Sequence, residues 1–196
     1  LPSWIHEAYK SPKFEPQACK LKLDLPPKNI FIPDELKPIC PDDPSSLPKF
    51  PTKVHSTDFS ELWFKQDNQF RVPKAKARCN IYDAHFLSTP KTYNVARLWV
   101  LLVKEHIREL GYQASMASSE VDVVLEQNFL MLDFGGFDSK FAEFIHSILE
   151  RFLEFNPRDY ESQFSSILET EISDLRAEFK ADPYKQVAKI RGAVIK

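Results

Sequence analysis

Proline divides this chain into two unlike parts. Residues 1–60 hold eleven of the fifteen prolines and none of the four glycines. Because each proline removes a backbone donor and fixes φ, such a stretch is unsuited to the interior of a helix or sheet. We expect residues 1–60 to form an extended, proline-rich connector or arm and residues 61–196 to form a single domain. The arm also carries more apolar side chains than a free tether needs, so we expect it to pack against a neighbour: Trp4, Ile5, Tyr9, Leu21, Leu23, Leu25, Ile30, Phe31 and Ile32.

At the stretch 61–75 the chain changes from a proline-rich sequence to a periodic one. Apolar and polar residues alternate in 61–65 and again in 70–72, and Asp67-Asn68 between them tolerate the positive φ of a tight turn. This pattern predicts a β-hairpin. Pro73 then removes a ladder donor, which fits a sheet edge or a strand end.

A strand and a long helix are predicted next. Residues 77–82 alternate with period two, as a half-buried strand does. Thr89-Pro90 supplies an N-cap followed by proline at the first helical position. The helix is expected to run to about Leu110 and to end at Gly111. Its segment 98–103 is apolar all round, which indicates the most buried helix of the domain.

The remainder predicts three strands and then helices. Strands are expected at about 112–117, 121–126 and 129–134, with Gln127-Asn128 as a turn, Gly135-Gly136 breaking the sheet and Asp138 able to cap. Asn156-Pro157 and Asp182-Pro183 begin two further helices, after one that carries an apolar stripe over 141–153. This order predicts an α+β, two-layer αβ roll with helices packed on one face of a mostly antiparallel sheet.

Composition narrows the class of protein. The 26 basic and 28 acidic residues are interspersed, which points to neither nucleic acid nor a membrane surface as partner, and no apolar run approaches the roughly 18 residues of a membrane span. Cys19, Cys40 and Cys79 lack metal spacing and are expected to be reduced thiols, which favours a cytoplasmic protein. Because the chain begins at Leu1 without a methionine, we expect it to be a piece of something longer.

Two stretches together resemble a known family. They are Leu-Trp-Phe-Lys-Gln-Asp with Phe-x-x-Pro-Lys-Ala at 62–75, and Leu-Pro-Pro-Lys-Asn-Ile-Phe-Ile-Pro at 25–33. Their sequence and spacing resemble the insulinase family of zinc metallopeptidases, the inverted zincins or M16 peptidases, at the start of the family's C-terminal half. The resemblance implies the connector plus the third, non-catalytic domain, with the αβ-roll fold.

The resemblance also implies a function for the parent protein. That protein would be a zinc metalloendopeptidase that degrades peptides, with the zinc in the parent and none bound by this fragment. This piece alone would be no enzyme. It would form chamber wall and contact the N-terminal catalytic half and the fourth domain of the same chain. The alternative is a non-enzymatic scaffold or interaction protein that reuses the superfamily fold.

The family's zinc motif is His-x-x-Glu-His on a helix, with a distant glutamate as third ligand. The nearest approach is 102–106, which keeps Glu105-His106 but has Leu102 where the first histidine must stand. Leucine offers no lone pair. We therefore expect no catalytic, metal or cofactor-binding residue in this chain, and a His106 that is solvated or stabilised at a helix C-terminus.

No other pattern indicates a catalytic site. Ser115 to Ser119 and Ser165-Ser166 lack a nucleophile elbow, and Gly135-Gly136 is too short to cradle phosphate. The remaining histidines have no partner at ligand spacing: His6, His55, His85 and His146.

Two groups of charged residues have simpler explanations. Glu169 and Glu171 are expected on an exposed helix face. Lys74, Lys76 and Arg78 either line a groove for a polyanion or peptide or are strand-edge charges that discourage pairing.

Freed from its neighbours, the chain is also expected to expose apolar surface and to self-associate.

Overall fold

The structure, a computed structural model, describes residues 27–37, 47–67, 69–83, 88–126, 129–180 and 182–194. Several sequence predictions concern residues that lie outside these ranges: Trp4, Ile5, His6, Tyr9, Cys19, Leu21, Leu23, Leu25, Cys40, His85 and the turn at Gln127-Asn128.

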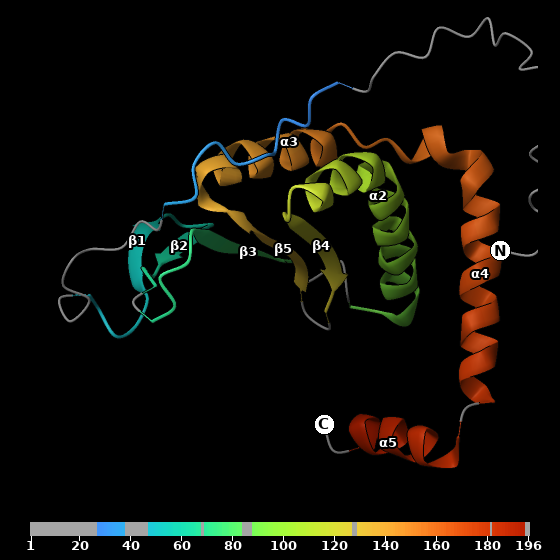
Figure 1. The fold of residues 1–196 in the computed structure, drawn as a ribbon. Helices are drawn as coiled ribbons and strands as arrows, with labels where there is room; N and C mark the ends of the chain where they lie inside the picture. Colours follow the sequence, from blue (N-terminus) through green and yellow to red (C-terminus); the bar gives the residue numbers. More distant parts are fainter. Residues whose placement is uncertain are drawn as a thin grey trace, which may run out of the picture.

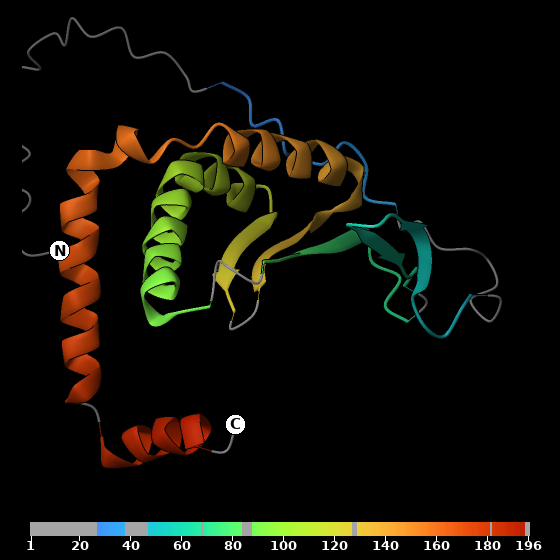
Figure 2. The ribbon, with the colours of Figure 1, turned by 180° about the vertical axis from the view of Figure 1, so that it is seen from behind.

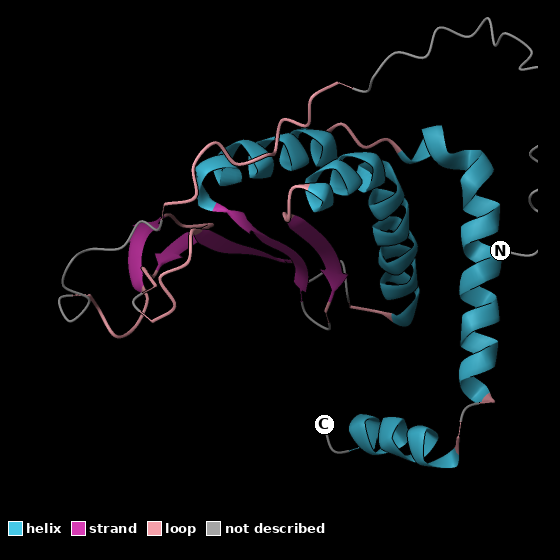
Figure 3. Ribbon diagram, viewed as in Figure 1, coloured by secondary structure: helices cyan, strands magenta, loops and turns pink. Residues whose placement is uncertain are grey.

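The centre of the fold is a three-stranded sheet of β3 (Lys74–Tyr82), β4 (Glu120–Leu125) and β5 (Phe129–Phe137). The order is β3-β5-β4, and both outer strands pair antiparallel with β5. β3 and β4 therefore run parallel to each other and are joined through the helix α2 (Pro90–Met116), as in a split βαβ unit. Figure 3 shows helices on one side of this sheet, so the predicted α+β class is confirmed.

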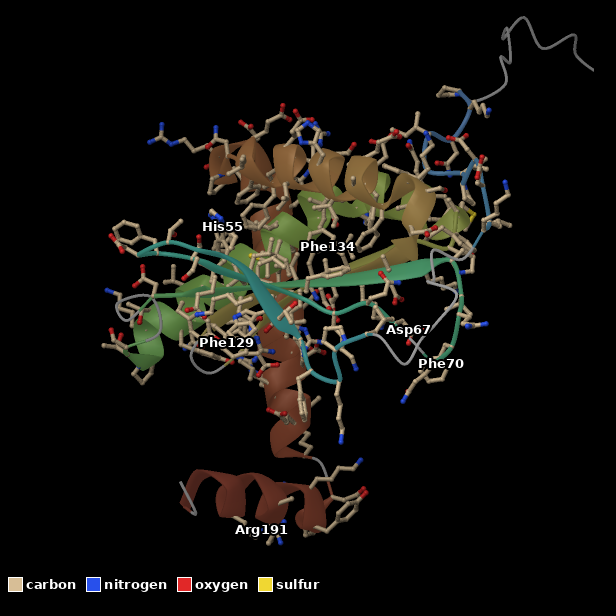
Figure 4. All side chains as sticks on the ribbon, turned by 90° about the vertical axis from the view of Figure 1, so that its left-hand side faces the viewer. His55, Asp67, Phe70, Phe129, Phe134 and Arg191 are labelled. Carbon is tan, nitrogen blue, oxygen red and sulfur yellow. The ribbon has the colours of Figure 1, made fainter. Side chains whose placement is uncertain are left out.

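Alternation along β5 separates the two faces of the sheet. Leu130, Leu132 and Phe134 are buried, at 5%, 1% and 3% exposed, whereas the residues between them are only half-buried. Figure 4 shows Phe134 on the side of the helices and Phe129 on the opposite side. The core lies between the buried face and the helices, and its buried members are Phe31, Val100, Ile107, Ala114, Ala117, Val123, Leu130, Leu132, Phe134, Phe144 and Ile148.

Helix α2 begins where the sequence predicts and ends later. Thr89 is the N-cap: its hydroxyl accepts from the Thr92 amide at 3.2 Å, the Thr92 hydroxyl accepts from the Thr89 amide at 3.0 Å, and Pro90 follows. The predicted stop at Gly111 and the predicted strand at 112–117 are wrong. The buried stripe continues past Gly111 to Ala114, and a single interior glycine costs a helix only about 1 kcal/mol.

A left-handed residue ends α2. Ser118 has φ 58°, and the amides of Ser118 and Ser119 donate to the carbonyls of Ser115 and Ala114 at 3.0 and 2.9 Å. These two bonds form a Schellman motif, usually built with glycine. The chain then enters β4 directly: Ser119 is buried, and β4 starts at the next residue, Glu120.

The glycine pair at 135–136 lies inside β5 instead of breaking the sheet, so that prediction is wrong as well. Gly135 pairs with Lys76, and Gly136 with Ala75. A Cβ at Gly136 would stand 2.6 Å from the Ser119 hydroxyl, so the absence of a side chain lets the end of α2 approach the strand. A short 3-10 turn, η2 (Asp138–Lys140), follows, and Asp138 makes no side-chain cap.

The predicted hairpin within 61–75 is replaced by another pairing. β2 (Glu61–Phe64) pairs antiparallel with β1 (Thr52–Ser56), and residues 70–72 form no strand. The Asp67 carboxylate accepts from the amides of Gln69, Phe70 and Arg71, which folds this stretch into a loop. No proline occurs between Pro51 and Pro73, which is why β1 can form within the arm region.

Phe31 fixes part of the arm region to the body. Its side chain is 1% exposed and meets Phe144 edge to face at 5.5 Å. Asn29 donates to the Gln113 carbonyl at 2.6 Å, and Lys140 pairs with Asp34 at 2.9 Å. The Lys140 hydrogen bond lowers the pKa of Asp34, so this contact is present above the ordinary carboxyl pKa and is lost as pH falls. The division at residue 60 stays a prediction.

Three helices complete the chain: α3 (Phe141–Leu153), α4 (Glu161–Phe179) after the 3-10 turn η3 (Pro157–Tyr160), and α5 (Pro183–Val194). Asn156 is a cap as predicted, since its side chain accepts from the Arg158 amide at 3.3 Å, but it caps the turn η3 and the long helix α4 begins only at Glu161. Figures 1 and 2 show α4 standing beside α2 and α5 turning back from its far end. Among the described helices, none has the length and apolar content to cross a membrane.

The two glycine environments predict opposite outcomes for the same substitution. A Cβ at Gly111 would meet Val121 Cγ1 at 3.8 Å, an ordinary contact, so Gly111→Ala should raise the free energy of unfolding by about 0.5–1 kcal/mol. Gly136→Ala should lower it by roughly 1–3 kcal/mol, because the buried Ser119 stands in the way. Urea unfolding measures both. Equal effects of the two substitutions would contradict the placement of Gly111 within the helix.

Candidate functional site

The stretch 102–106, the nearest approach to the zinc motif, lies in the middle of α2, with Leu102 and His106 about one helical turn apart. Leu102 is 5% exposed and faces the interior, as its apolar neighbourhood predicts. His106 is half-buried, and the helix continues ten residues beyond it, to Met116. The expectation that His106 is solvated or at a helix C-terminus is therefore wrong.

Both ring nitrogens of His106 are hydrogen-bonded. Nε2 lies 2.8 Å from the Arg151 carbonyl oxygen, and Nδ1 lies 2.7 Å from the Tyr160 hydroxyl. Since a carbonyl can only accept, Nε2 carries the proton, and in the neutral ring Nδ1 accepts from Tyr160. Arg151 is in the last turn of α3, whose carbonyls lack partners inside the helix, so His106 satisfies one of them.

An aromatic cluster surrounds this histidine. The rings of Phe155 and Tyr160 lie 5.5 and 5.7 Å from the imidazole, and Trp99, two turns earlier on α2, meets Phe152 and Phe155 edge to face. These contacts join α2 to the end of α3 and to the turn that starts α4. The sequence does not reveal this cluster, because it brings together residues far apart in the chain: Tyr160 is 54 residues from His106.

The residues of this site do not fit a zinc ion. Leu102 is a buried hydrocarbon where the first ligand of the inverted motif must stand, and the Nε2 proton and the Tyr160 bond occupy both nitrogens of His106. Within the part of the chain that the structure describes, no group of three or more His, Cys, Asp or Glu side chains could hold a metal.

The other residues considered from sequence do not gather into a site. His146 is exposed on α3 and pairs with Glu150 on its own helix at 3.2 Å, and His55 is exposed on β1. Ser115 donates to the Tyr112 carbonyl within α2. The glycine pair has Glu120 and Ser119 against it, so it offers no space for phosphate.

Glu171 differs from the prediction of an exposed position. Its side chain is 15% exposed and accepts from Arg97 of α2 at 2.7 Å, whereas Glu169 is exposed as predicted. This ion pair joins α4 to α2. A shallow groove beside it is lined by Leu101, Lys104, Glu105, Arg108, Ser166, Ile167, Thr170 and Glu171. The sequence could not place Glu171, because the side of α4 that faces α2 depends on the turn before it.

The basic residues of β3 lie on an edge strand of the three-stranded sheet. Arg78 pairs with Asp133 of β5 at 3.2 Å, and that hydrogen bond raises the pKa of Arg78 further. Lys74 lies 5.4 Å from the ring centroid of Phe137. Lys76 lines a depression on the sheet face opposite the helices, together with acidic residues of β4 and β5. Ordinary edge charges account for these contacts, and the groove interpretation stays open.

The His106 contacts predict a local loss when the ring is removed. His106→Ala should lower the free energy of unfolding by about 1–2 kcal/mol, because two hydrogen bonds are lost and one carbonyl and one hydroxyl lose their partner. Amide exchange in α4 should also become faster. His146→Ala is the matched control and should cost less than about 0.5 kcal/mol, because its ion pair is exposed. Equal losses for the two variants would show that His106 does not tie α3 to α4.

Comparison with known proteins gives consistent relatives. The profile of a family described as the middle or third domain of peptidase_M16 matches residues 2–196. Insulin-degrading enzyme of Drosophila melanogaster is 32% identical over 172 residues, which are 84% of this chain and 16% of that protein. Human insulin-degrading enzyme is 31% identical over 68% of this chain and 13% of its own length, and human nardilysin is 26% identical over 68% and 12%.

A solved structure agrees with the fold. The crystal structure of pitrilysin matches 84% of this chain and 17% of its own with a TM-score of 0.74 at 17% identity. The chain thus spans about one sixth of the length of such relatives. With the family profile matching almost every residue, this chain belongs to the M16, or insulinase, family of peptidases as a middle or third domain.

Proposed function

We propose that this chain is the non-catalytic third domain, with its connector, of a longer zinc metalloendopeptidase that degrades peptides. The observation that carries the proposal concerns the stretch nearest to the zinc motif: Leu102 is packed in the core, and both nitrogens of His106 are hydrogen-bonded to neighbouring elements. A site used in this way for packing is not available for catalysis. The parent would hold its zinc in another domain.

The role proposed for this piece is structural. The face of the sheet that the helices leave bare would form part of the chamber wall, and the arm would link the two halves of the parent. The N-terminal catalytic half and the fourth domain of the same chain are the proposed partners, and peptides are the proposed substrates of the parent. A cytoplasmic location is part of the proposal and is supported by the cysteine pattern. Self-association of the isolated chain is proposed on the basis of apolar side chains left exposed, such as Ile172 and Leu175 of α4.

Metal content and activity test this function. The purified 196-residue chain, dialysed against a weak chelator, should retain no stoichiometric zinc and cleave no fluorogenic peptide. The parent should retain stoichiometric zinc and cleave the peptide, and replacing an upstream His-x-x-Glu-His should abolish its cleavage. Tight zinc in the isolated chain, or a parent that lacks the upstream motif and cleaves nothing, would contradict the proposal; the second outcome would identify a scaffold protein.

Restoring the missing histidine should not create an enzyme. Leu102→His should lower the free energy of unfolding by about 1–3 kcal/mol, because it buries an imidazole without a partner, and should give no zinc-dependent cleavage. Val95→His is the matched control on the same helix, where the side chain is 59% exposed and the cost should stay below about 0.5 kcal/mol. Denaturation with and without added zinc tests this prediction, since zinc-dependent stabilisation of the Leu102→His variant would show a latent metal site.

A further inference from the structure

We propose that the open edge of β3 is a strand-addition site, occupied by an extended segment from another part of the parent polypeptide in which acidic and apolar residues alternate. That the segment comes from the parent rests on the proposed function above. β3 pairs with β5 along one side, and within the described ranges no strand pairs along its other side. An edge strand of nine residues presents a row of backbone donors and acceptors to a partner.

The apolar layer is unfinished on the β3 side. On β5, Leu130 and Leu132 are covered by the helices, at 5% and 1% exposed. Their direct cross-strand neighbours on β3 are Ile81, which is 44% exposed, and Cys79, which is also exposed. On β3 the helix layer covers the partly buried Ala77 but leaves Cys79 and Ile81 exposed. A strand added to β3 would extend the apolar face and cover Ile81.

The opposite edge of the sheet is closed, so β3 is the edge that can accept a strand. Helix α2 packs along β4. The Asp122 carboxylate accepts from the amide of Val123 at 2.9 Å and from Lys104 of α2 at 2.8 Å. A helix packed along an edge strand is one of the ways in which proteins block strand pairing, and the Val123 amide already has a partner.

Charge decides what kind of strand fits. β3 carries Lys74, Lys76 and Arg78 at alternate positions on the bare face and has no acidic residue between 74 and 82. A second copy paired antiparallel along the full length of β3 would place Arg78 directly opposite the Arg78 of that copy, and directly opposite like charges are unfavourable. A strand with acidic residues on the bare face would neutralise the basic side chains of β3. Apolar residues on its other face, beside Cys79 and Ile81, would cover the exposed part of the apolar layer.

The length of the relatives indicates where the added strand comes from. This chain matches only 16% of the Drosophila relative and 17% of pitrilysin, so most of a parent of that size lies outside it. A segment tethered in the same polypeptide has an effective concentration of about millimolar, which favours it over a free peptide or a second molecule.

The first experiment uses the 196-residue chain and two synthetic peptides, (Glu-Val)4 and (Lys-Val)4. The readout is the rate at which a maleimide labels Cys79, which peptide mapping separates from labelling of Cys19 and Cys40. Saturating (Glu-Val)4 should slow labelling by about fivefold or more, and (Lys-Val)4 should leave the rate unchanged. The double variant Lys74→Glu with Lys76→Glu, checked for folding by its melting curve, should reverse this preference. No slowing by the acidic peptide, or equal slowing by both, would overturn the charge assignment.

The second experiment uses the parent protein. Cys79 should be labelled about tenfold more slowly there than in the isolated chain, since labelling then requires local opening. A benzophenone attached to Cys79 of the isolated chain, with the rest of the parent added separately, should cross-link to one segment outside residues 1–196. Equal labelling rates, or cross-links only to another copy of this chain, would overturn the proposal. Neither readout depends on zinc or cleavage, so the inference and the proposed function can fail separately.

Discussion

The contact on which the rest of the structure depends is the buried ring of Phe144. It is 0% exposed and meets Phe31 at 5.5 Å and Phe134 at 6.0 Å, both edge to face. These three rings come from the arm region, the central strand and α3, so one cluster joins three parts of the chain. Burying aromatic rings of this size gives a large apolar contribution, and the edge-on geometry adds about 0.5–1.5 kcal/mol for each pair. The position of the arm along the body follows from this cluster.

The second junction is polar and joins α2 to the end of α3 and to η3. His106 is held between a carbonyl of α3 that has no partner inside that helix and a hydroxyl in η3, and the rings of Phe155 and Tyr160 pack against its imidazole. The residue that comes closest to a family ligand thus sets the direction in which the chain leaves α3 for α4. In the stretch 102–106, therefore, His106 holds two other elements in place through its hydrogen bonds, and Leu102 is part of the buried core.

The unfinished surfaces have a common physical cause. A sheet of three strands covered by two helices can bury the row along β5, but the core side of β3 and the apolar stripe of α4 extend beyond the helices that would cover them. Phe164, Ile172 and Leu175 remain between 38% and 40% exposed. A domain of a larger polypeptide can leave such surface for its neighbours, and membership in a family of much longer proteins is consistent with that.

The sequence by itself determined the α+β class, the start of α2 at Thr89-Pro90, the Asn156 cap and the burial of Leu102, because each depends on local chemistry or short-range periodicity. It also determined that the inverted zinc motif is incomplete. Only the tertiary structure decided that α2 runs through Gly111, that Gly135-Gly136 stay within β5, that β2 pairs with β1, and that His106 and Glu171 are held against other elements. In each of these cases contacts with residues distant in the chain outweigh a local preference of about 1 kcal/mol, and a single sequence does not reveal such contacts.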